Sequence, residues 1–274
     1  MLQLEMIDRV RMLCLSDERI VAAWMYGSFP AGEADAYSDI EFLIYVRDEA
    51  LPSFAPATWV NQIAPLALYF VNEFGVGAAL FENTIRGEFH FEPQSEMPHL
   101  VAYREEAGFP AVKRMLLVDK TGELCSLLEE ISGPGPERAT ADQAQRLIAG
   151  SLNWLLFGLG VLARGERVRA LELLGMLHRY LLWMARLAET AMTHYATPAR
   201  CAEHELSAQA LQRFEACTAS LHGNELECAW ATAWQWAGEL HVALAERYEL
   251  VLPQPLITRI AARFAALLAP DIEG

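Results

Sequence analysis

Positive charge is scarce in this chain, and the scarcity is uneven. Lys and Arg together number 21 against 36 Asp and Glu, which gives a formal net charge of −15. Residues 1–135 hold 9 basic and 21 acidic side chains, so most of the deficit lies in the first half. Proteins that grip DNA or RNA non-specifically need a basic surface that neutralises phosphates. We therefore expect no nucleic-acid partner, whereas a cationic small molecule, or a phosphate ligand that arrives with a metal ion, suits the composition.

The chain also lacks the cysteine patterns that build disulfides or zinc sites. No two of its cysteines form a CxxC pair, and no Cys/His spacing is typical of zinc. Scattered cysteines in odd number are typical of reduced side chains that pack in a protein interior, and no secretion signal is evident in the first residues. We therefore expect a cytoplasmic location. The five cysteines are Cys14, Cys125, Cys201, Cys217 and Cys228.

No apolar run reaches the ~20 residues that a membrane-spanning helix needs. The longest, at 147–163, has 17 residues without a formal charge, but it includes Ser151, Asn153 and three glycines. Charged segments lie directly outside it. This pattern predicts a buried helix of a bundle and no membrane partner.

What the chain does have is enough apolar sequence for one large domain or two ordinary ones. It has 274 residues, of which 53% are hydrophobic. The segment Ser-Gly-Pro-Gly-Pro at 132–136 can continue neither a helix nor a central strand. We therefore predict one domain at 1–132 and a second at 137–274.

Before this boundary, short apolar runs alternate with turns, as is typical of a mixed β-sheet. Helical spacing of apolar residues at 3–14 predicts an opening helix. Period-two alternation at 85–91 places Arg86, Glu88 and His90 on one face of a strand and apolar residues on the other. Strands are expected at 20–26, 40–46, 67–71, 78–82, 85–91 and 115–118.

After the boundary the pattern is helical. Thr140 followed by Gln143 is typical of a capped helix start, and Gly165 predicts a break between the first two helices. The fold class expected is therefore α+β, with an N-terminal mixed-sheet domain and a C-terminal α-helical bundle. The five expected helices run from 140 to about 164, 167–190, 205–220, 224–248 and 255–268.

The strongest sign of chemistry is a turn followed by a pair of carboxylates. A predicted strand ends at Tyr26, and Gly27 and Ser28 then allow a tight turn that can cradle a phosphate if a helix starts there. Asp39 and Glu41 lie two positions apart at the start of the next strand, so they share a face. Such hard oxygen donors suit Mg²⁺, which is usually held by one or two carboxylates and substrate phosphates. The alternative is an ordinary turn beside an edge strand that carries surface acids.

A third carboxylate is needed if a hydroxyl nucleophile is to lose its proton. Glu88 is the candidate, because it lies on a strand among apolar residues that can tune a base. The alternative is an exposed ion pair with Arg86. Glu82 and Glu92 are rivals for the role, although each sits at an expected strand end.

Longer strings around these residues resemble a known family. Gly27-Ser28 followed by Asp39-Ile40-Glu41 resembles the signature of the polymerase-beta-like nucleotidyltransferase superfamily. The strings at 16–19, 25–29, 37–42 and 85–91, together with 161–166 and 170–174 in the helical half, resemble the two-domain lincosamide nucleotidyltransferases. One departure is visible. Family members continue the Gly-Ser-Phe turn with Thr and often a basic residue, whereas this chain has Pro30-Ala31.

The resemblance implies transfer of a nucleoside monophosphate, typically AMP from ATP, to a hydroxyl of lincomycin or clindamycin, with Mg²⁺ and release of pyrophosphate. Asp39 and Glu41 would be metal ligands, and Glu88 would be the base. The resemblance also implies a homodimer. Gly27, Ser28 and the Ser38 that precedes Asp39 are the expected nucleotide-binding residues. An aminoglycoside nucleotidyltransferase is the nearest alternative, and a protein-modifying or toxin–antitoxin nucleotidyltransferase is a different class of alternative.

Several other residues fit a site less well. His90 shares a face with Glu88 and is expected to line the acceptor pocket, although a structural histidine fits as well. The cations Arg164, Arg167 and Arg169 could meet phosphates, but a solvated helix end is the preferred interpretation, and Lys120 is ambiguous. Core or dimer packing is the preferred interpretation of Trp230, Trp234 and Trp236.

Overall fold

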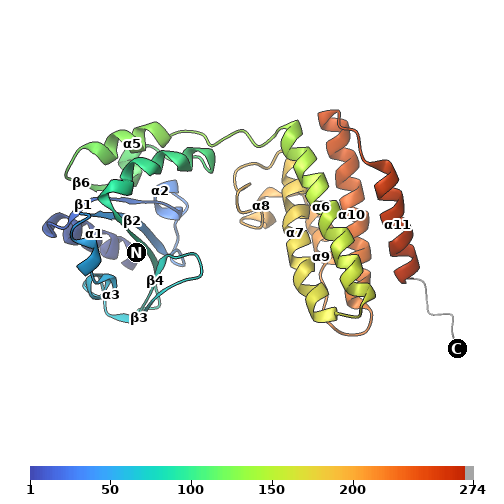
Figure 1. Cartoon of the computed structure of the whole chain (residues 1–274), viewed down its shortest axis with the longest axis horizontal. Coiled ribbons are helices and arrows are strands. Elements are labelled where there is room, and N and C mark those ends of the chain that lie inside the picture. The colour runs from blue at the N-terminus through green and yellow to red at the C-terminus, as the bar shows by residue number, and fades with distance from the viewer. Residues whose placement is uncertain (269–274) are drawn as a thin grey trace. The chain divides into compact units, whose positions relative to one another are not determined.

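The computed structural model describes residues 1–268, and the chain divides into two compact units at 136/137 (Figure 1). The first unit is built on a mixed sheet, and the second is helical. The predicted α+β class is therefore confirmed. The unit boundary falls at the end of the Gly- and Pro-rich segment 132–136, whose proline rings and glycines favour neither regular structure.

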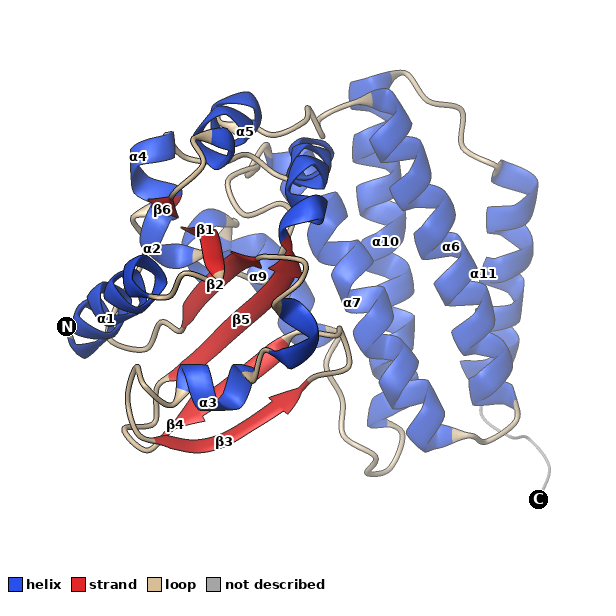
Figure 2. Ribbon diagram, turned by 60° about the vertical axis from the view of Figure 1, so that its left-hand side comes forward, coloured by secondary structure: helices blue, strands red, loops and turns tan. Residues whose placement is uncertain are grey.

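The six-stranded sheet of the first unit has the order β3-β4-β5-β2-β1-β6. Only the central pair β2–β5 is parallel, and every other neighbouring pair is antiparallel (Figure 2). All six strands lie where the sequence predicted them, within two residues at either end. The strands are β1 (Ile20–Met25), β2 (Ile40–Val46), β3 (Leu66–Val71), β4 (Gly77–Phe81), β5 (Arg86–Pro93) and β6 (Leu116–Asp119).

One face of the sheet is sealed. Helices α1 (Leu2–Ser16) and α3 (Pro56–Val60) cover it, and Val10 and Trp59 pack there against Phe42 and Phe89. The alternation predicted for β5 is observed, because Gly87 and Phe89 are buried on this side while Arg86, Glu88 and His90 point to the other.

The opposite face is covered at one end only. The 3-10 segment η2 (Gln94–Glu105) and helix α5 (Glu123–Ile131) pack over β1 and the middle of β2, where they bury Trp24 and Tyr45. The part of this face that β3 and β4 contribute is open, since Leu68 and Phe70 are 51% and 44% exposed. The carboxylates of interest therefore lie on a face that small molecules can reach. The remaining short elements are α2 (Ser28–Ala31), η1 (Leu51–Ser53) and α4 (Val112–Met115).

The second unit has four long helices and two short ones among its described residues. The Thr140 hydroxyl accepts a hydrogen bond from the Gln143 amide, as the capping pattern predicted. The helix predicted at 205–220 is present but shorter, at Ala208–Ala216. The chain leaves helical geometry at Leu206, and Ser207 then caps a new helix by accepting from the Ala210 amide. The helices are α6 (Ala141–Ala163), α7 (Arg167–Glu189), α8 (Ala202–Glu205), α9 (Ala208–Ala216), α10 (Glu225–Tyr248) and α11 (Gln254–Leu268).

Helix α6 passes the length and composition test for a membrane span, but its setting is that of a core helix. Half of the most apolar 18-residue stretch of this helix is buried inside the structure. It packs against α7, α10 and α11, and Leu155 and Leu159 lie in the bundle core. Its apolar sequence is explained by this packing, as the interrupted run predicted.

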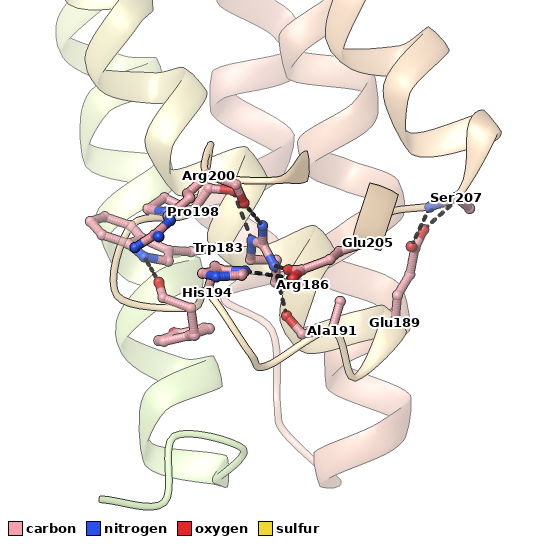
Figure 3. A network of polar contacts seen from close by, with 10 residues as sticks. Trp183, Arg186, Glu189, Ala191, His194, Pro198, Arg200, Glu205 and Ser207 are labelled. Atoms are coloured by element: carbon pink, nitrogen blue, oxygen red, sulfur yellow. Dashed lines mark hydrogen bonds and ion pairs between the residues drawn. The ribbon is translucent and has the colours of Figure 1, made fainter. Parts of the chain in front are cut away.

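A buried arginine ties the loop between α7 and α8 to the bundle (Figure 3). Arg186 on α7 is 0% exposed, and its guanidinium donates to the carbonyl oxygens of Ala191, Pro198 and Arg200 at 3.0, 2.8 and 2.5 Å. It also pairs with Glu205 at 2.5 Å, and the second oxygen of Glu205 contacts His194. Backbone carbonyls of an irregular loop need such donors when they are buried, so this loop is a fixed part of the unit.

Candidate active site

The turn after β1 is shaped by Gly27. This residue has φ +78°, and a Cβ atom placed there would overlap the carboxylate of Glu41, so only glycine fits. The short helix α2 begins at Ser28, the start that the phosphate-turn hypothesis requires. The Ser28 hydroxyl oxygen is buried and has no hydrogen-bond partner. A buried polar atom without a partner is rare in native proteins and calls for an explanation, such as a catalytic role or a bound ion.

Three carboxylates meet beside this turn because of the register between β2 and β5. Glu41 is paired with Glu88 across the parallel strands, and Asp39 directly precedes β2. Paired residues of neighbouring strands lie about 4.8 Å apart and project to the same side. Glu88 is 20% exposed and Asp39 32% exposed, so both remain accessible. The structure thus brings together the three acids that the sequence singled out.

Arg86 holds two of these acids together. Its guanidinium pairs with Asp39 Oδ2 at 2.5 Å and also with Glu88 Oε1. The ion pair that the sequence offered as an alternative for Glu88 is therefore present, and it is extended to Asp39. Because Arg86 is 43% exposed, the pairing is open to solvent, and pairs of this kind are weak.

Tyr26 contacts the other oxygen of Glu88. Its hydroxyl lies 3.4 Å from Glu88 Oε2 and 2.8 Å from Nε2 of His90. Burial, followed by the charges of Glu88 and Glu41, raises the pKa of Tyr26, so the hydroxyl keeps its proton. Burial also lowers the pKa of His90, although Glu88 opposes this effect. A hydroxyl has one proton to donate, so the Tyr26 hydroxyl cannot donate to both neighbours. It donates to Glu88 when it accepts a hydrogen bond from the protonated Nε2 of neutral His90.

The other residues expected near the nucleotide are placed as follows. Ser38 bonds within its own loop, where its hydroxyl accepts from the Asp35 amide at 2.9 Å and donates to the Asp35 carboxylate at 3.1 Å. Its nucleotide contact stays a prediction. Of the rival bases, Glu82 follows β4 and is exposed, whereas Glu92 lies within β5 and pairs in register with Tyr45.

A cavity of about 330 Å³ opens beside Glu88. Its lining includes the polar side chains of Glu88, His90 and Asn72. Its walls are mainly apolar and aromatic, so the cavity suits a ligand that has both a polar group and an apolar portion. The wall residues are Trp24, Tyr26, Leu43, Phe74, Val76, Tyr103 and Phe109.

The donors at this site fit a magnesium ion by their chemistry. Within residues 1–268, no group of three or more His, Cys, Asp or Glu side chains is arranged to hold a metal ion. Mg²⁺ does not need such a group, because it is usually held by one or two carboxylates, waters and substrate phosphates. Asp39 and Glu41 are hard oxygen donors on one face, and the unpartnered Ser28 hydroxyl lies at the turn beside them. A metal that arrives with a nucleotide would match this donor set.

The weaker candidates are explained by packing and ion pairs within their own unit. Arg164 and Arg169 both pair with Glu166, and Arg167 pairs with Glu227, so the helix-end interpretation holds. Lys120 donates to the carbonyl oxygen of Asp17 at 2.8 Å.

The tryptophans of α10 are core residues. Trp230 and Trp236 are 0% and 3% exposed, and Trp234 stacks on Phe264. The preferred interpretation as packing residues is therefore correct for all three.

Tyr26 is the site residue whose role the sequence did not reveal. The sequence showed only that it ends a strand. Its position two residues after Trp24 places it on the same face, which was a usable signal. The contact with Glu88 could not be foreseen, because it depends on the order β5-β2-β1 in the sheet.

A family match concerns the second unit. Residues 140–263 match the model for the C-terminal domain of lincosamide nucleotidyltransferase-like proteins. The match spans most of the helical unit and less than half of the chain. It supports the resemblance to lincosamide-type nucleotidyltransferases, and it relates the chain to antibiotic-modifying nucleotidyltransferases.

Two solved structures are similar to the chain at low identity. An aminoglycoside 6-adenyltransferase from Bacillus subtilis is 15% identical with a TM-score of 0.45, and the similarity covers 97% of this chain and 99% of that one. A nucleotidyltransferase-like protein from Exiguobacterium sibiricum is 13% identical with a TM-score of 0.41, over 96% and 89% of the two chains. No curated protein is a significant match. TM-scores of 0.45 and 0.41 at such low sequence identity support no conclusion about function.

Proposed function

We propose that the protein inactivates a lincosamide antibiotic by transferring AMP from ATP to one of its hydroxyls, with release of pyrophosphate. The observation that carries the proposal is the register of β2 and β5, which sets Glu41 beside Glu88 at the Gly27-Ser28 turn. A turn for phosphates, a carboxylate pair for a metal and a third carboxylate for a proton are the parts that phosphoryl transfer needs.

In the proposed mechanism, Glu88 takes the proton of the acceptor hydroxyl. The hydroxyl oxygen attacks the α-phosphorus in line, a new P–O bond forms, and the bond to the β-phosphate oxygen breaks so that pyrophosphate leaves. Asp39 and Glu41 would hold Mg²⁺, which neutralises phosphate charge when bound. Arg86 and Tyr26 hold the two oxygens of Glu88 and so keep the base oriented.

The cavity beside Glu88 supports a lincosamide acceptor. A lincosamide joins a polyhydroxylated sugar to an alkylated pyrrolidine, so it has one polar part and one apolar part. The polar lining residues Glu88 and His90 suit a hydroxyl, and the aromatic lining residues suit the apolar part and a protonated amine. We extend the proposal to a homodimer, as the resemblance implies, and to a cytoplasmic location, as the scattered cysteines suggest.

Two substitutions test the proposal together. Pyrophosphate release that depends on both ATP and lincomycin is measured for the wild type, Asp39→Ala and Glu88→Gln. Loss of a general base typically lowers the rate by about 10²–10⁴-fold, and we expect a loss in this range for Glu88→Gln. Asp39→Ala removes a proposed metal ligand, so we expect a large loss there as well. Glu82→Gln is the matched control, since Glu82 is an exposed acid at a strand end outside the site. Unimpaired release by both site variants would refute the residue assignments.

An aminoglycoside is the second candidate acceptor, because the excess of acids in residues 1–135 suits a polycation. Cells that express the protein separate the candidates. Protection against lincomycin supports the first, and protection against streptomycin or kanamycin without protection against lincomycin supports the second.

A further inference from the structure

A nucleoside triphosphate carries several negative charges, and the first unit has few cations to meet them. Nine Lys and Arg residues lie in 1–136, all of them within the described part of the chain. The side chains of seven of them are hydrogen-bonded or ion-paired within this unit. Arg11, Arg19 and Arg86 pair with carboxylates, and Arg9, Arg47, Arg104 and Lys120 donate to backbone carbonyls.

The two cations that remain are neighbours on α4. The side chains of Lys113 and Arg114 make no hydrogen bond or ion pair with any residue in 1–268, and both are exposed. Their backbone is nevertheless fixed, because the following residue, Met115, is 0% exposed in the core beneath β1. A short helix anchored in this way holds its exposed side chains at a defined place on the surface.

Arg114 differs from Lys113 in where its side chain ends. A Cβ atom placed on Gly32 would overlap the Nη2 atom of Arg114, so the guanidinium lies directly against Gly32. Gly32 is the C-cap of α2, and its amide donates to the Ser28 carbonyl at 2.9 Å. The guanidinium is therefore one helical turn, about 5.4 Å of rise, from the start of the proposed phosphate turn.

The turn itself supplies no charge to a phosphate. Helix α2 consists of Ser28, Phe29, Pro30 and Ala31, so beyond the Ser28 hydroxyl it has no polar side chain. A cation from another element is needed if the turn is to bind more than one phosphate group tightly. Helix α4 packs against α2 and provides one beside the C-cap of α2.

On this basis, which rests on the proposed function, we infer that Arg114 binds the phosphate chain of the nucleotide at the far end of the turn that starts at Ser28. The planar guanidinium can donate two hydrogen bonds to neighbouring phosphate oxygens. Gly32 has φ +83°, which favours glycine, and the absence of a side chain there leaves room for the guanidinium. Lys113, next to it in the sequence and also exposed, is assigned no such role.

The test compares Arg114→Gln with Lys113→Gln in the full chain. Both changes remove one exposed positive charge from α4, so they are matched in net charge and in burial. Binding of ATP, AMP and inorganic tripolyphosphate is measured calorimetrically with Mg²⁺ and without acceptor, and the KM values for ATP and lincomycin are measured separately. We expect Arg114→Gln to weaken ATP and tripolyphosphate binding by about three- to tenfold and to raise the KM for ATP equally. AMP binding and the KM for lincomycin should change by less than about twofold, as should all values for Lys113→Gln.

The outcomes separate this inference from the proposed function. A wild type that binds ATP, with Arg114→Gln binding it within twofold, overturns the role of Arg114 alone. Equal weakening by both variants also overturns it, since the effect is then one of general charge. A wild type that binds neither ATP nor tripolyphosphate overturns the proposed function itself. Arg114→Lys keeps the charge but not the planar fork, so partial recovery of ATP binding supports direct phosphate contact.

Discussion

Each unit of this protein has an arginine at the centre of a polar network, and the two networks are built differently. Arg186 in the helical unit is 0% exposed and donates to three backbone carbonyls in addition to Glu205. Arg86 in the sheet unit is 43% exposed, and its guanidinium pairs with the carboxylates of Asp39 and Glu88. The same side-chain type therefore serves one fixed network and one that solvent can reach.

The difference indicates what each network is for. Buried carbonyls around Arg186 have no water to replace a lost donor, so its contacts hold a loop in a single conformation. The carboxylates around Arg86 are reached by solvent, and they are the groups to which the proposed reaction assigns a metal and a proton. Contacts that substrates must rearrange should be weak, whereas contacts that shape a loop should be strong.

The largest effect predicted from this comparison is on the stability of the helical unit. Replacing Arg186 by Met leaves three carbonyls and the charge of Glu205 without their donor, and breaking a buried pair in this way costs about 3–5 kcal/mol. Denaturant unfolding followed by tryptophan fluorescence measures the loss, since Trp183 donates to the Tyr195 carbonyl in the same loop. Arg186→Lys is a milder variant for the case in which Arg186→Met does not fold. Its free energy of unfolding should lie between those of the wild type and Arg186→Met. A loss below about 1 kcal/mol in either variant would contradict the fixed role of Arg186.

The same change at Arg86 is the matched control. Arg86→Met should alter the free energy of unfolding by no more than about 1 kcal/mol, because exposed ion pairs contribute little. If Arg86→Met proves as destabilising as Arg186→Met, the contrast between the two networks is wrong.

A smaller effect is expected within the exposed network, at Tyr26. Tyr26→Phe removes the hydroxyl that lies 3.4 Å from Glu88 Oε2, and this contact is long for a hydrogen bond. We expect kcat to fall by about three- to tenfold with little change in the KM for ATP, as suits the loss of one such bond.

Tyr103→Phe is the control for Tyr26→Phe, because Tyr103 lines the same cavity without contacting Glu88. An unchanged kcat in Tyr26→Phe, or an equal loss of kcat in Tyr103→Phe, would refute the positioning role of Tyr26.

The strands of the first unit were predictable because they are short apolar runs between turns. Ile40–Val46 is rich in β-branched and aromatic residues, and it is a strand over that whole range. Short elements that follow loops were not predicted. Helix α5 depends on the Asp119 carboxylate, which accepts from the amides of Gly122 and Cys125 and so starts the helix through a side chain rather than through apolar spacing.

The site was predictable as a set of residues but not as an arrangement. Gly27, Asp39 and Glu41 are close in sequence, so their grouping follows from one strand–turn–strand unit. Glu88 comes 47 residues after Glu41, and its place beside Glu41 depends on the parallel pairing of β2 with β5. Sequence pattern does not specify which strands become neighbours, so the motif resemblance supplied that pairing and the contacts of Tyr26 went unseen.

One measurement tests the central claim directly. Lincomycin is incubated with the full-length protein, ATP and Mg²⁺, and its mass is then determined, with the Glu88→Gln variant as the parallel sample. The account predicts that the wild type adds the mass of one AMP to lincomycin and that Glu88→Gln adds far less over the same time. Unmodified lincomycin after incubation with wild-type protein that binds ATP would contradict the account.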